Sequence, residues 1–286
     1  MKGINGQTTV LAIFGDPVEH SLSPVMHNAA FRDLGWNCVY VPCRVLTEDI
    51  SVAVRSIRVL GYKGVNVTIP HKQAVVSELD EVFGDTRLSG SVNTIVNRNG
   101  KLLGTSTDGS GLVRSLREDG DFDVAGKNVL IFGAGGSSVA IIFRLVTAGV
   151  KTLTVVNRDF TKAVNLQEKV WLRTRFAINV HDTNRLETLD WSSFDLVINT
   201  TSVGLHNEAT IIPKQLLSRH HFVYDLVYKP GDTTLINQAK EVGCRTLSGL
   251  SLLLYQGVES FKIWFEEDPP IAVMREALEQ AMRIRK

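Results

Sequence analysis

Residues 129–158 constrain the fold more than any other stretch of the 286-residue chain. They begin with the apolar run VLIF, pass through GAGGSS and a helix-length segment that ends at Gly149, and finish with LTVVNR. A strand, a tight turn, a helix and a second strand in this order form a βαβ unit, in which the two strands are parallel. The segment therefore predicts an α/β protein with a mostly parallel sheet.

The turn of this unit carries Gly133, Gly135 and Gly136, which allow the main chain to approach a bound group closely. Backbone N–H groups and the positive end of the helix dipole favour a phosphate at this position. A strand directly before the glycines and a helix directly after them are the context that a dinucleotide-binding turn requires. The alternative is a tight turn that binds no ligand.

The end of the second strand bears on the choice of cofactor. NAD-binding proteins usually place Asp or Glu there, to accept a hydrogen bond from the ribose 2′-hydroxyl. This chain has Asn157 and Arg158, and a guanidinium suits a 2′-phosphate, with Lys162 one helical turn further on. Asp159 opposes this assignment, because a carboxylate repels a phosphate. The pattern therefore favours NADP and leaves NAD open.

Short apolar segments alternate with helix-length segments elsewhere in the chain too. Residues 10–15, 38–45 and 64–69 predict strands, and helices are expected between them, with Ser23 and Thr47 as N-caps. Asn99-Gly100 predicts a hairpin turn, and the last 35 residues or so predict two amphipathic helices. We expect two α/β domains. Residues 1–107 with 253–286 would bind the substrate, the C-terminal helices returning to this domain, and residues 108–252 would form a Rossmann-type dinucleotide-binding domain.

The net charge and the number of cysteines argue against several classes of function. A net charge of +1 provides no electrostatic basis for binding nucleic acid or an anionic membrane. The three cysteines, Cys38, Cys43 and Cys244, form no metal-ligand pattern, and an odd number of thiols fits a reducing compartment. No signal-peptide core or membrane-spanning apolar run is visible. We expect a cytoplasmic monomer or homodimer that acts on a small molecule and uses no metal, nucleic acid or membrane.

The segment GVNVTIPHK places Lys72 just after a strand, where open α/β sheets bind their ligands. A helix is expected to start there, and its positive end would disfavour the charged form of the lysine. The neighbouring segments supply Asn66, Thr68, Asn93 and Asp108 as polar groups, and we expect Asn66 to contact the substrate. The common alternative for such a lysine is a solvated surface position.

Asp108 lies where the two expected domains join, so its carboxylate can face a cleft between them and pair with Lys72. Its alternative role is to cap the helix that follows. The two hydroxyls of Ser21 and Ser23 are likewise ambiguous. Next to a helix N-terminus they form either a carboxylate-binding site or a cap.

Eight motifs occur in the order and spacing found in shikimate dehydrogenases, and the match extends over nearly the whole chain. The motifs are SLSPVMHN, GVNVTIPHK, SVNTIVN, STDGSGL, GAGGSS, NRDFTK, YDLVYKP and GLSLLLYQG. The chain thus resembles this family, which includes the quinate/shikimate dehydrogenases. The resemblance implies reversible reduction of the 3-dehydroshikimate carbonyl by NADPH, on the route to aromatic amino acids. It also implies that Lys72 and Asp108 are the catalytic pair, Lys72 exchanging the proton.

By the same resemblance, Ser21 and Ser23 bind the substrate carboxylate. Thr68, Asn93 and Gln256 hold the ring hydroxyls, and Tyr228 lies nearby. The residues implied for the cofactor are Gly133, Ala134, Gly135, Gly136 and Ser137 for the pyrophosphate, Asn157, Arg158, Asp159 and Lys162 for the adenosine phosphate, and Leu226 and Gly249 for the nicotinamide end.

The chain departs from the usual family pattern at several positions. Ser106 replaces an amide near the substrate, Val139 replaces a basic residue after the glycine turn, and Leu252 replaces a methionine near the nicotinamide. Together with Asp159, Val139 keeps an NAD-dependent quinate/shikimate dehydrogenase open as an alternative. A sensor that binds polyol and cofactor without turnover is the alternative from a different class, and a Lys72–Asp108 pair argues against it.

Overall fold

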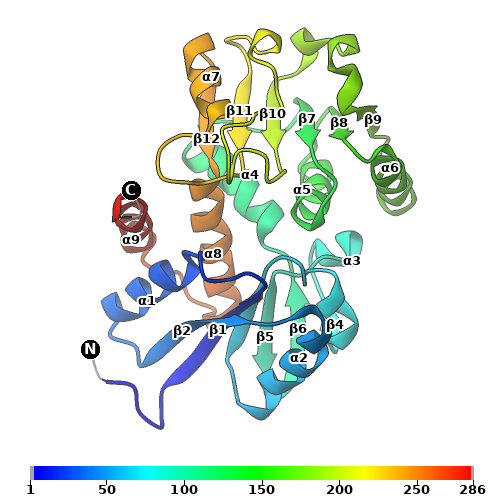
Figure 1. Cartoon of the computed structure of the whole chain (residues 1–286). Coiled ribbons are helices and arrows are strands. Elements are labelled where there is room, and N and C mark those ends of the chain that lie inside the picture. Colours follow the sequence, from blue (N-terminus) through cyan, green and yellow to red (C-terminus); the bar gives the residue numbers. More distant parts are fainter. Residues whose placement is uncertain (1–2, 285–286) are drawn as a thin grey trace. The chain divides into compact units, whose positions relative to one another are not determined.

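The computed structural model describes residues 3–284, and the chain divides into two compact units (Figure 1). The first unit contains the residues up to Gly111 and those from Leu253 onward, and the second is Leu112–Leu252. The boundary was expected before residue 108, whereas Asp108 groups with the first unit. Residues 1, 2, 285 and 286 of the expected ranges lie outside the described part. No helix within residues 3–284 is both long and apolar enough to cross a lipid bilayer.

The first unit is built on a mixed sheet with the strand order β2-β1-β3-β5-β6-β4. Strand β1 pairs in parallel with β2 and β3, and β5 pairs antiparallel with β3 and β6. The hairpin between β5 and β6 turns at Asn99 and Gly100, which both have positive φ, as the Asn-Gly pair predicted. The strands are β1 (Thr9–Gly15), β2 (Cys38–Arg44), β3 (Gly64–Val67), β4 (Glu81–Val82), β5 (Thr94–Arg98) and β6 (Lys101–Thr105).

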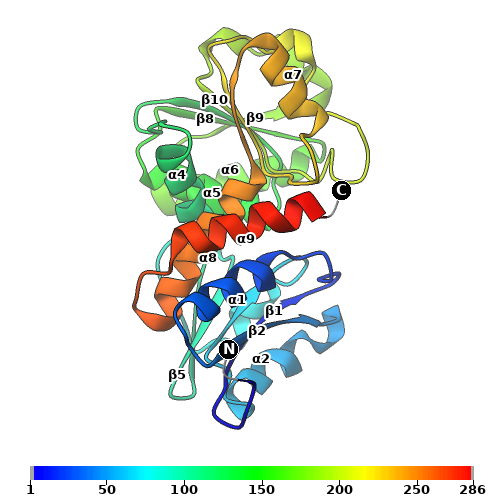
Figure 2. The ribbon, with the colours of Figure 1, turned by 90° about the vertical axis from the view of Figure 1, so that its left-hand side faces the viewer.

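Helices cover both faces of this sheet. Helix α2 (Ile50–Val59) packs on the face to which Ala12, Phe14 and Val65 contribute. On the other face, α1 (Ser23–Asp33) packs on α9 (Ile271–Ile284), which lies beside it in Figure 2. Helix α8 (Gly249–Phe265) joins this face through an aromatic cluster. Its members are His27, Phe31, Trp36, Tyr40, Phe261, Trp264 and Phe265. The two C-terminal helices thus belong to the first unit.

The two expected N-caps are wrong. Leu22 occupies the N-cap position of α1, and Ser23 is the first helical residue. The Ser23 side chain hydrogen bonds to the Tyr40 hydroxyl instead of to the backbone of its own helix. Thr47 begins a short 3₁₀ helix, η1 (Thr47–Asp49), which precedes α2, and its side chain caps neither helix.

The second unit contains a parallel sheet with the order β12-β11-β10-β7-β8-β9. This is the order of a Rossmann-type doubly wound sheet, in which the chain reverses direction beside its first strand. The strands are β7 (Asn128–Phe132), β8 (Thr152–Asn157), β9 (Asn179–Asp182), β10 (Leu196–Asn199), β11 (Phe222–Asp225) and β12 (Arg245–Ser248). The helices are α5 (Gly136–Thr147), α6 (Phe160–Thr174) and α7 (Thr234–Val242), and α4 (Asp108–Glu118) enters from the first unit.

His27 is a buried ionisable group in the aromatic cluster of the first unit. Its ring stacks on Tyr40 at 4.7 Å and lies 5.3 Å from the ring of Trp264. Neither ring nitrogen has a hydrogen-bond partner among the described residues, and burial lowers the pKa of His27 from 6.5 to about 3. The folded state therefore keeps this histidine neutral at pH values where an unfolded chain would protonate it.

We predict that this histidine makes the fold sensitive to mild acid. Below pH 6.5 the unfolded chain binds a proton that folded His27 accepts only near pH 3, so acid shifts the equilibrium toward the unfolded chain. The loss reaches about 3 kcal/mol at pH 4.5, since one pKa unit corresponds to about 1.4 kcal/mol. Urea unfolding of wild type and His27→Phe at pH 7 and pH 4.5 measures it. The variant should lose less stability, and exposed His206→Gln should match wild type; equal losses in all three would contradict the prediction.

Candidate active site

Lys72 lies in a turn that follows β3. The chain leaves the strand through a cis Ile69–Pro70 peptide bond and passes Lys72 before the short 3₁₀ helix η2 (Ala74–Glu78) begins. The α-helix expected at this point is therefore absent, and the helix-dipole argument does not apply to Lys72. Its position is fixed instead by its main chain, because the Lys72 carbonyl accepts a hydrogen bond from Val92 N at 2.8 Å.

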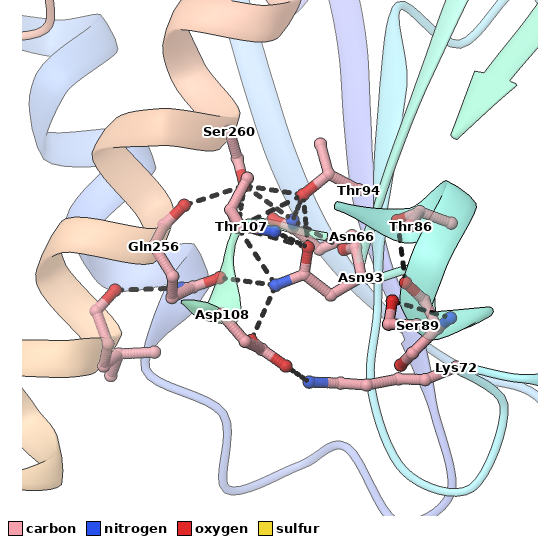
Figure 3. A network of polar contacts seen from close by, with 12 residues as sticks. Asn66, Lys72, Thr86, Ser89, Asn93, Thr94, Thr107, Asp108, Gln256 and Ser260 are labelled. Carbon is pink, nitrogen blue, oxygen red and sulfur yellow. Dashed lines mark hydrogen bonds and ion pairs between the residues drawn. The ribbon is translucent and has the colours of Figure 1, made fainter. Parts of the chain in front are cut away.

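The side chains of Lys72 and Asp108 form an ion pair in the first unit. Lys72 Nζ donates to Asp108 Oδ2 at 2.5 Å, and the two side chains are 12% and 7% exposed (Figure 3). Asp108 is the first residue of α4, so it reaches the lysine from the start of a helix. Such a pair is mostly removed from water, and charges in that position need further polar partners to offset the cost of desolvation.

Asn93 supplies one of these partners. Its Nδ2 donates to Asp108 Oδ1 at 2.8 Å, while its Oδ1 accepts from the backbone N–H of Thr107 at 2.8 Å. A backbone N–H can only donate, so this contact determines which end of the amide is the oxygen. The amino group of Asn93 must then face the aspartate. The Asn93 main chain is held as well, since its N–H donates to Thr105 O and its carbonyl accepts from Val67 N.

Gln256, on helix α8, completes this side of the site. Its Oε1 lies 3.4 Å from Asn93 Nδ2, and its Nε2 donates to the carbonyl of Leu253 in the preceding turn. Gly111 allows α8 to approach α4 closely, because a Cβ at that position would lie 2.7 Å from the backbone nitrogen of Gln256. A bulkier residue would push the glutamine away from Asn93 and Asp108.

The other residues expected to bind the substrate differ in whether their polar groups are already hydrogen bonded within the protein. Thr68 is half-buried after β3, and within residues 3–284 its hydroxyl makes no hydrogen bond. Ser21 Oγ accepts from Ser23 N at 3.3 Å, which keeps the two serines close together. Asn66 is only 4% exposed, and both ends of its amide are bonded to protein groups. Thr68 and Ser21 are thus open to a ligand, whereas Ser23 and Asn66 are buried and bonded to protein groups.

The glycine turn of the second unit has the features that a pyrophosphate site requires. Gly133 has φ +116°, and a Cβ there would collide with the Thr200 hydroxyl, so a side chain is excluded. Gly135 is the N-cap of α5 and offers no side chain to the first N–H groups of that helix. The space where its Cβ would lie contains no atom within 4 Å. Together with Ala134, Gly136 and Ser137, this turn leaves donors and room for a phosphate.

The residues after β8 are arranged around the start of α6. Asp159 is the N-cap of that helix, and its Oδ1 accepts from Lys162 N at 3.2 Å. Its Oδ2 lies 3.6 Å from Lys162 Nζ, and Asn157 Nδ2 donates to its main-chain carbonyl at 2.7 Å. The carboxylate that argued against a bound phosphate is therefore engaged by a helix end and an ammonium group. Arg158 is exposed.

Leu226, Tyr228 and Gly249 belong to the second unit, where a buried aspartate organises the segment after β11. Asp225 accepts from Asn199 Nδ2 at 2.9 Å, from Val227 N at 3.1 Å and from Thr233 Oγ1 at 2.6 Å. Burial raises the pKa of Asp225. Gly249 contacts the same segment so closely that a Cβ would overlap the Leu226 carbonyl. Leu226 is thus held by its neighbours on both sides.

The sequence analysis did not single out Thr107, or Asp225 with its partners Asn199 and Thr233. It also missed Tyr40 and Ser260, whose hydroxyls bond to the amide of Asn66. Tyr40, Thr107 and Ser260 read as ordinary members of a strand, a loop and a helix. The alternation of strand β2 could have placed Tyr40 on the same face as the site, but nothing local could have named its partner. Asp225 offered a signal, because a carboxylate at the end of an apolar strand has few reasons to be there unless it is bonded.

A Rossmann-type unit with a phosphate-binding turn and an α/β unit with a buried lysine–aspartate pair are the parts of a nicotinamide-dependent oxidoreductase. The chain matches family models described as shikimate dehydrogenase substrate binding domain (residues 13–95), shikimate / quinate 5-dehydrogenase (116–221) and shikimate 5'-dehydrogenase C-terminal domain (249–279). The chain belongs to the shikimate dehydrogenase family, as its motifs indicated.

Similar proteins resemble it over almost their full lengths. A shikimate dehydrogenase (NADP(+)) from Desulforamulus reducens is 43% identical over 96% of this chain and 96% of its own. A crystal structure of a shikimate dehydrogenase in complex with NADP+ has a TM-score of 0.92 and 37% identity, and the match covers 98% of both chains. A shikimate 5-dehydrogenase from Listeria monocytogenes in complex with shikimate and NAD has a TM-score of 0.91 and 35% identity, over 97% of this chain and 99% of that one.

We predict that Gly111→Ala lowers kcat/KM for shikimate by roughly tenfold or more. The new methyl group must displace Gln256, and small displacements of positioning groups are costly in catalysis. Steady-state kinetics of the purified variant measures the effect. Gly6→Ala is the control, because a Cβ there meets nothing within 4 Å. Equal kinetics for Gly111→Ala and wild type would show that the contact between α4 and α8 does not position the glutamine.

Proposed function

We propose that this chain catalyses the reversible reduction of 3-dehydroshikimate to shikimate with NADPH, a step on the chorismate route to aromatic amino acids. The observation that carries the proposal is the Lys72–Asp108 pair, held with Asn93 in a polar site of a chain that belongs to the shikimate dehydrogenase family. A group that exchanges a proton with a substrate oxygen needs this kind of placement, within reach of a ligand and oriented by a second group.

Lys72 is the proton donor in the direction of reduction and the acceptor in the reverse direction. As the ammonium form it gives a proton to the oxygen that was the carbonyl, and as the neutral amine it takes the proton back. Asp108 holds the Nζ of Lys72 through one carboxylate oxygen and the amide of Asn93 through the other. The aspartate thereby fixes the direction in which the lysine points, and it accepts a hydrogen bond from a neighbouring ring hydroxyl.

The substrate is recognised through a carboxylate at one end and hydroxyls around the ring. Ser21 and Ser23 bind the carboxylate, and Thr68, Asn93 and Gln256 bind the hydroxyls; Tyr228 is assigned to the substrate as well. Each of these groups rejects an analogue that lacks the matching hydroxyl, because the protein group would then be left unpaired. The free hydroxyl of Thr68 supports its assignment.

The second unit holds the cofactor. Residues 133–137 bind the pyrophosphate, Asn157, Arg158, Asp159 and Lys162 lie around the adenosine phosphate, and Leu226 and Gly249 border the nicotinamide. When bound, the nicotinamide supplies or accepts the hydride. We assign NADP as the cofactor because Arg158 suits a 2′-phosphate and because the Asp159 carboxylate is engaged by the end of α6 and by Lys162.

An NAD-dependent quinate/shikimate dehydrogenase is the second candidate, and Asp159 is the observation that favours it. A carboxylate near the ribose can accept from a 2′-hydroxyl, and the Listeria relative was crystallised with shikimate and NAD. A cytoplasmic location and a monomeric or homodimeric state complete the proposal. The three cysteines are free thiols, which fits a reducing compartment.

Initial rates with shikimate and with quinate, each with NADP and with NAD, test the proposal. The change in absorbance of the nicotinamide reports turnover directly. The highest kcat/KM should belong to shikimate with NADP. Preference for quinate with NAD would favour the second candidate, and binding of substrate and cofactor without turnover would indicate a sensor.

We predict that Lys72→Ala lowers kcat by about 10²- to 10⁴-fold, the range expected when a general acid–base group is lost. The KM for shikimate should change little, because the serines, Thr68 and Asn93 still hold the substrate. Steady-state kinetics measures both parameters, with Gln73→Ala, an exposed neighbour, as the control. A near-normal kcat would remove Lys72 from the chemistry.

We predict that Asp159→Thr raises the preference for NADP over NAD about fivefold. Threonine can still cap α6, and the change removes a negative charge whose repulsion of a phosphate is worth about 1 kcal/mol at an exposed site. The ratio of kcat/KM values for the two cofactors measures the preference. A matched loss of charge at Asp123→Asn, far along the chain from the site, should leave the ratio unchanged. An unaltered ratio in Asp159→Thr would show that this carboxylate plays no part in cofactor selection.

A further inference from the structure

A buried polar network extends from the catalytic pair into the core of the first unit. Its centre is Asn66, which lies in β3 (Figure 3). The neighbouring Val65 and Val67 belong to the hydrophobic core on the opposite side of the sheet. The members beyond the pair are Tyr40 on β2, Asn66 on β3, Thr94 on β5, Asn93 and Thr107 beside the sheet, and Gln256 and Ser260 on α8. No water is needed to connect any neighbouring two of them.

The orientation of the Asn66 amide is determined by its partners. Nδ2 donates to the backbone carbonyl of Asn93 at 3.0 Å, and a carbonyl can only accept. Oδ1 must then face the Tyr40 hydroxyl, which donates to it at 2.7 Å. Both ends of the amide are thus bonded to protein groups, and the residue is only 4% exposed, which leaves a substrate little access to it.

The amino group of Asn66 also directs two hydroxyls. It lies 3.2 Å from Thr94 Oγ1 and 3.1 Å from Ser260 Oγ, so its two hydrogens are shared among the lone pairs of these oxygens and the Asn93 carbonyl. The hydroxyl protons are then left for other acceptors. Thr94 donates to Asn93 Oδ1 at 2.8 Å, and Ser260 donates to the carbonyl of Gln256 at 2.9 Å. Asn66 thus acts through Thr94 on Asn93, which bonds to Asp108, and through Ser260 on the main chain of α8 at Gln256.

We propose that Asn66 is a positioning residue, which holds Asn93 from the core side so that its amino group presents to Asp108, and that it does not contact the substrate. This replaces the direct contact expected from the sequence, and it rests on the proposed function. Ser260 extends the same role to α8, because its hydroxyl accepts from Asn66 and so joins the helix that carries Gln256 to strand β3. Tyr40 links the network to Ser23, at the expected carboxylate end.

A double-mutant cycle separates the two roles of Asn66. If Asn66 acts through Asn93, Asn66→Ala should lower kcat/KM for shikimate about 10- to 100-fold in wild type and less than about threefold in an Asn93→Ala background. If Asn66 contacts the substrate itself, its effect should be the same in both backgrounds. The KM for NADP should stay within about twofold in every variant, because the cofactor residues lie in the second unit.

Ser260→Ala provides a second cycle in case Asn66→Ala does not fold. Ser260 is fully buried on a helix, where alanine is well tolerated, and no substrate can reach it. Its loss should lower kcat/KM about threefold or more in wild type, and again have little effect once Asn93 is alanine. Asn97→Ala is the matched control. Asn97 lies on β5, the strand that also carries Thr94, and its loss removes hydrogen bonds to Tyr62 O and Gly100 N. It should lower the Tm without changing kcat/KM.

The outcomes distinguish this inference from the proposed function. Wild-type protein that turns over none of the four substrate and cofactor pairs would overturn the proposed function and this inference together. Active wild type with additive effects in both cycles would overturn the positioning role alone. Active wild type with non-additive effects, and an active but less stable Asn97→Ala, would support it.

Discussion

The buried pair of Lys72 and Asp108 is the interaction on which the site of the first unit depends. Removing two charges from water is costly, and their attraction offsets that cost only when the geometry is good and the remaining lone pairs are bonded. Asp108 meets this condition because one oxygen accepts from Lys72 and the other from Asn93. The ion pair therefore needs the amide of Asn93, and the first unit must hold that amide in place.

The fold meets the requirement through main-chain contacts as much as through side chains. The Lys72 carbonyl is bonded to Val92, and the Asn93 main chain is bonded to the strands on both sides of it. The lysine and the asparagine thus share one stretch of backbone structure, although they lie in different turns. Asp108 approaches from α4, whose close contact with α8 at Gly111 brings Gln256 to the same place. A rigid arrangement of this kind suits a proton donor, whose direction matters more than its reach.

The second unit is built to leave room and backbone donors for a ligand, and it contains no buried ion pair among its described site residues. Its parallel sheet ends in a glycine turn that leaves N–H groups and space, and the segment after β11 is held by the buried carboxylate of Asp225. The Asp159 carboxylate caps helix α6 and lies close to the Lys162 ammonium group, so its negative charge is partly offset by groups of the protein itself. In the proposed function, the cofactor preference depends on how that carboxylate is held as well as on its presence.

The sequence by itself determined the Rossmann-type unit, the hairpin at Asn99-Gly100, and the family to which the chain belongs. Each of these depends on local patterns: a glycine turn between a strand and a helix, two residues with positive φ, and motifs in a set order. Only the tertiary structure decided that Ser23 bonds to Tyr40 instead of capping its helix, that Lys72 lies in a turn and not in an α-helix, and that Asn66 faces Ser260. The last two residues are 194 positions apart, and their contact depends on which face of β3 and which side of α8 pack together. No local pattern encodes that choice, because it is made by burial over the whole unit.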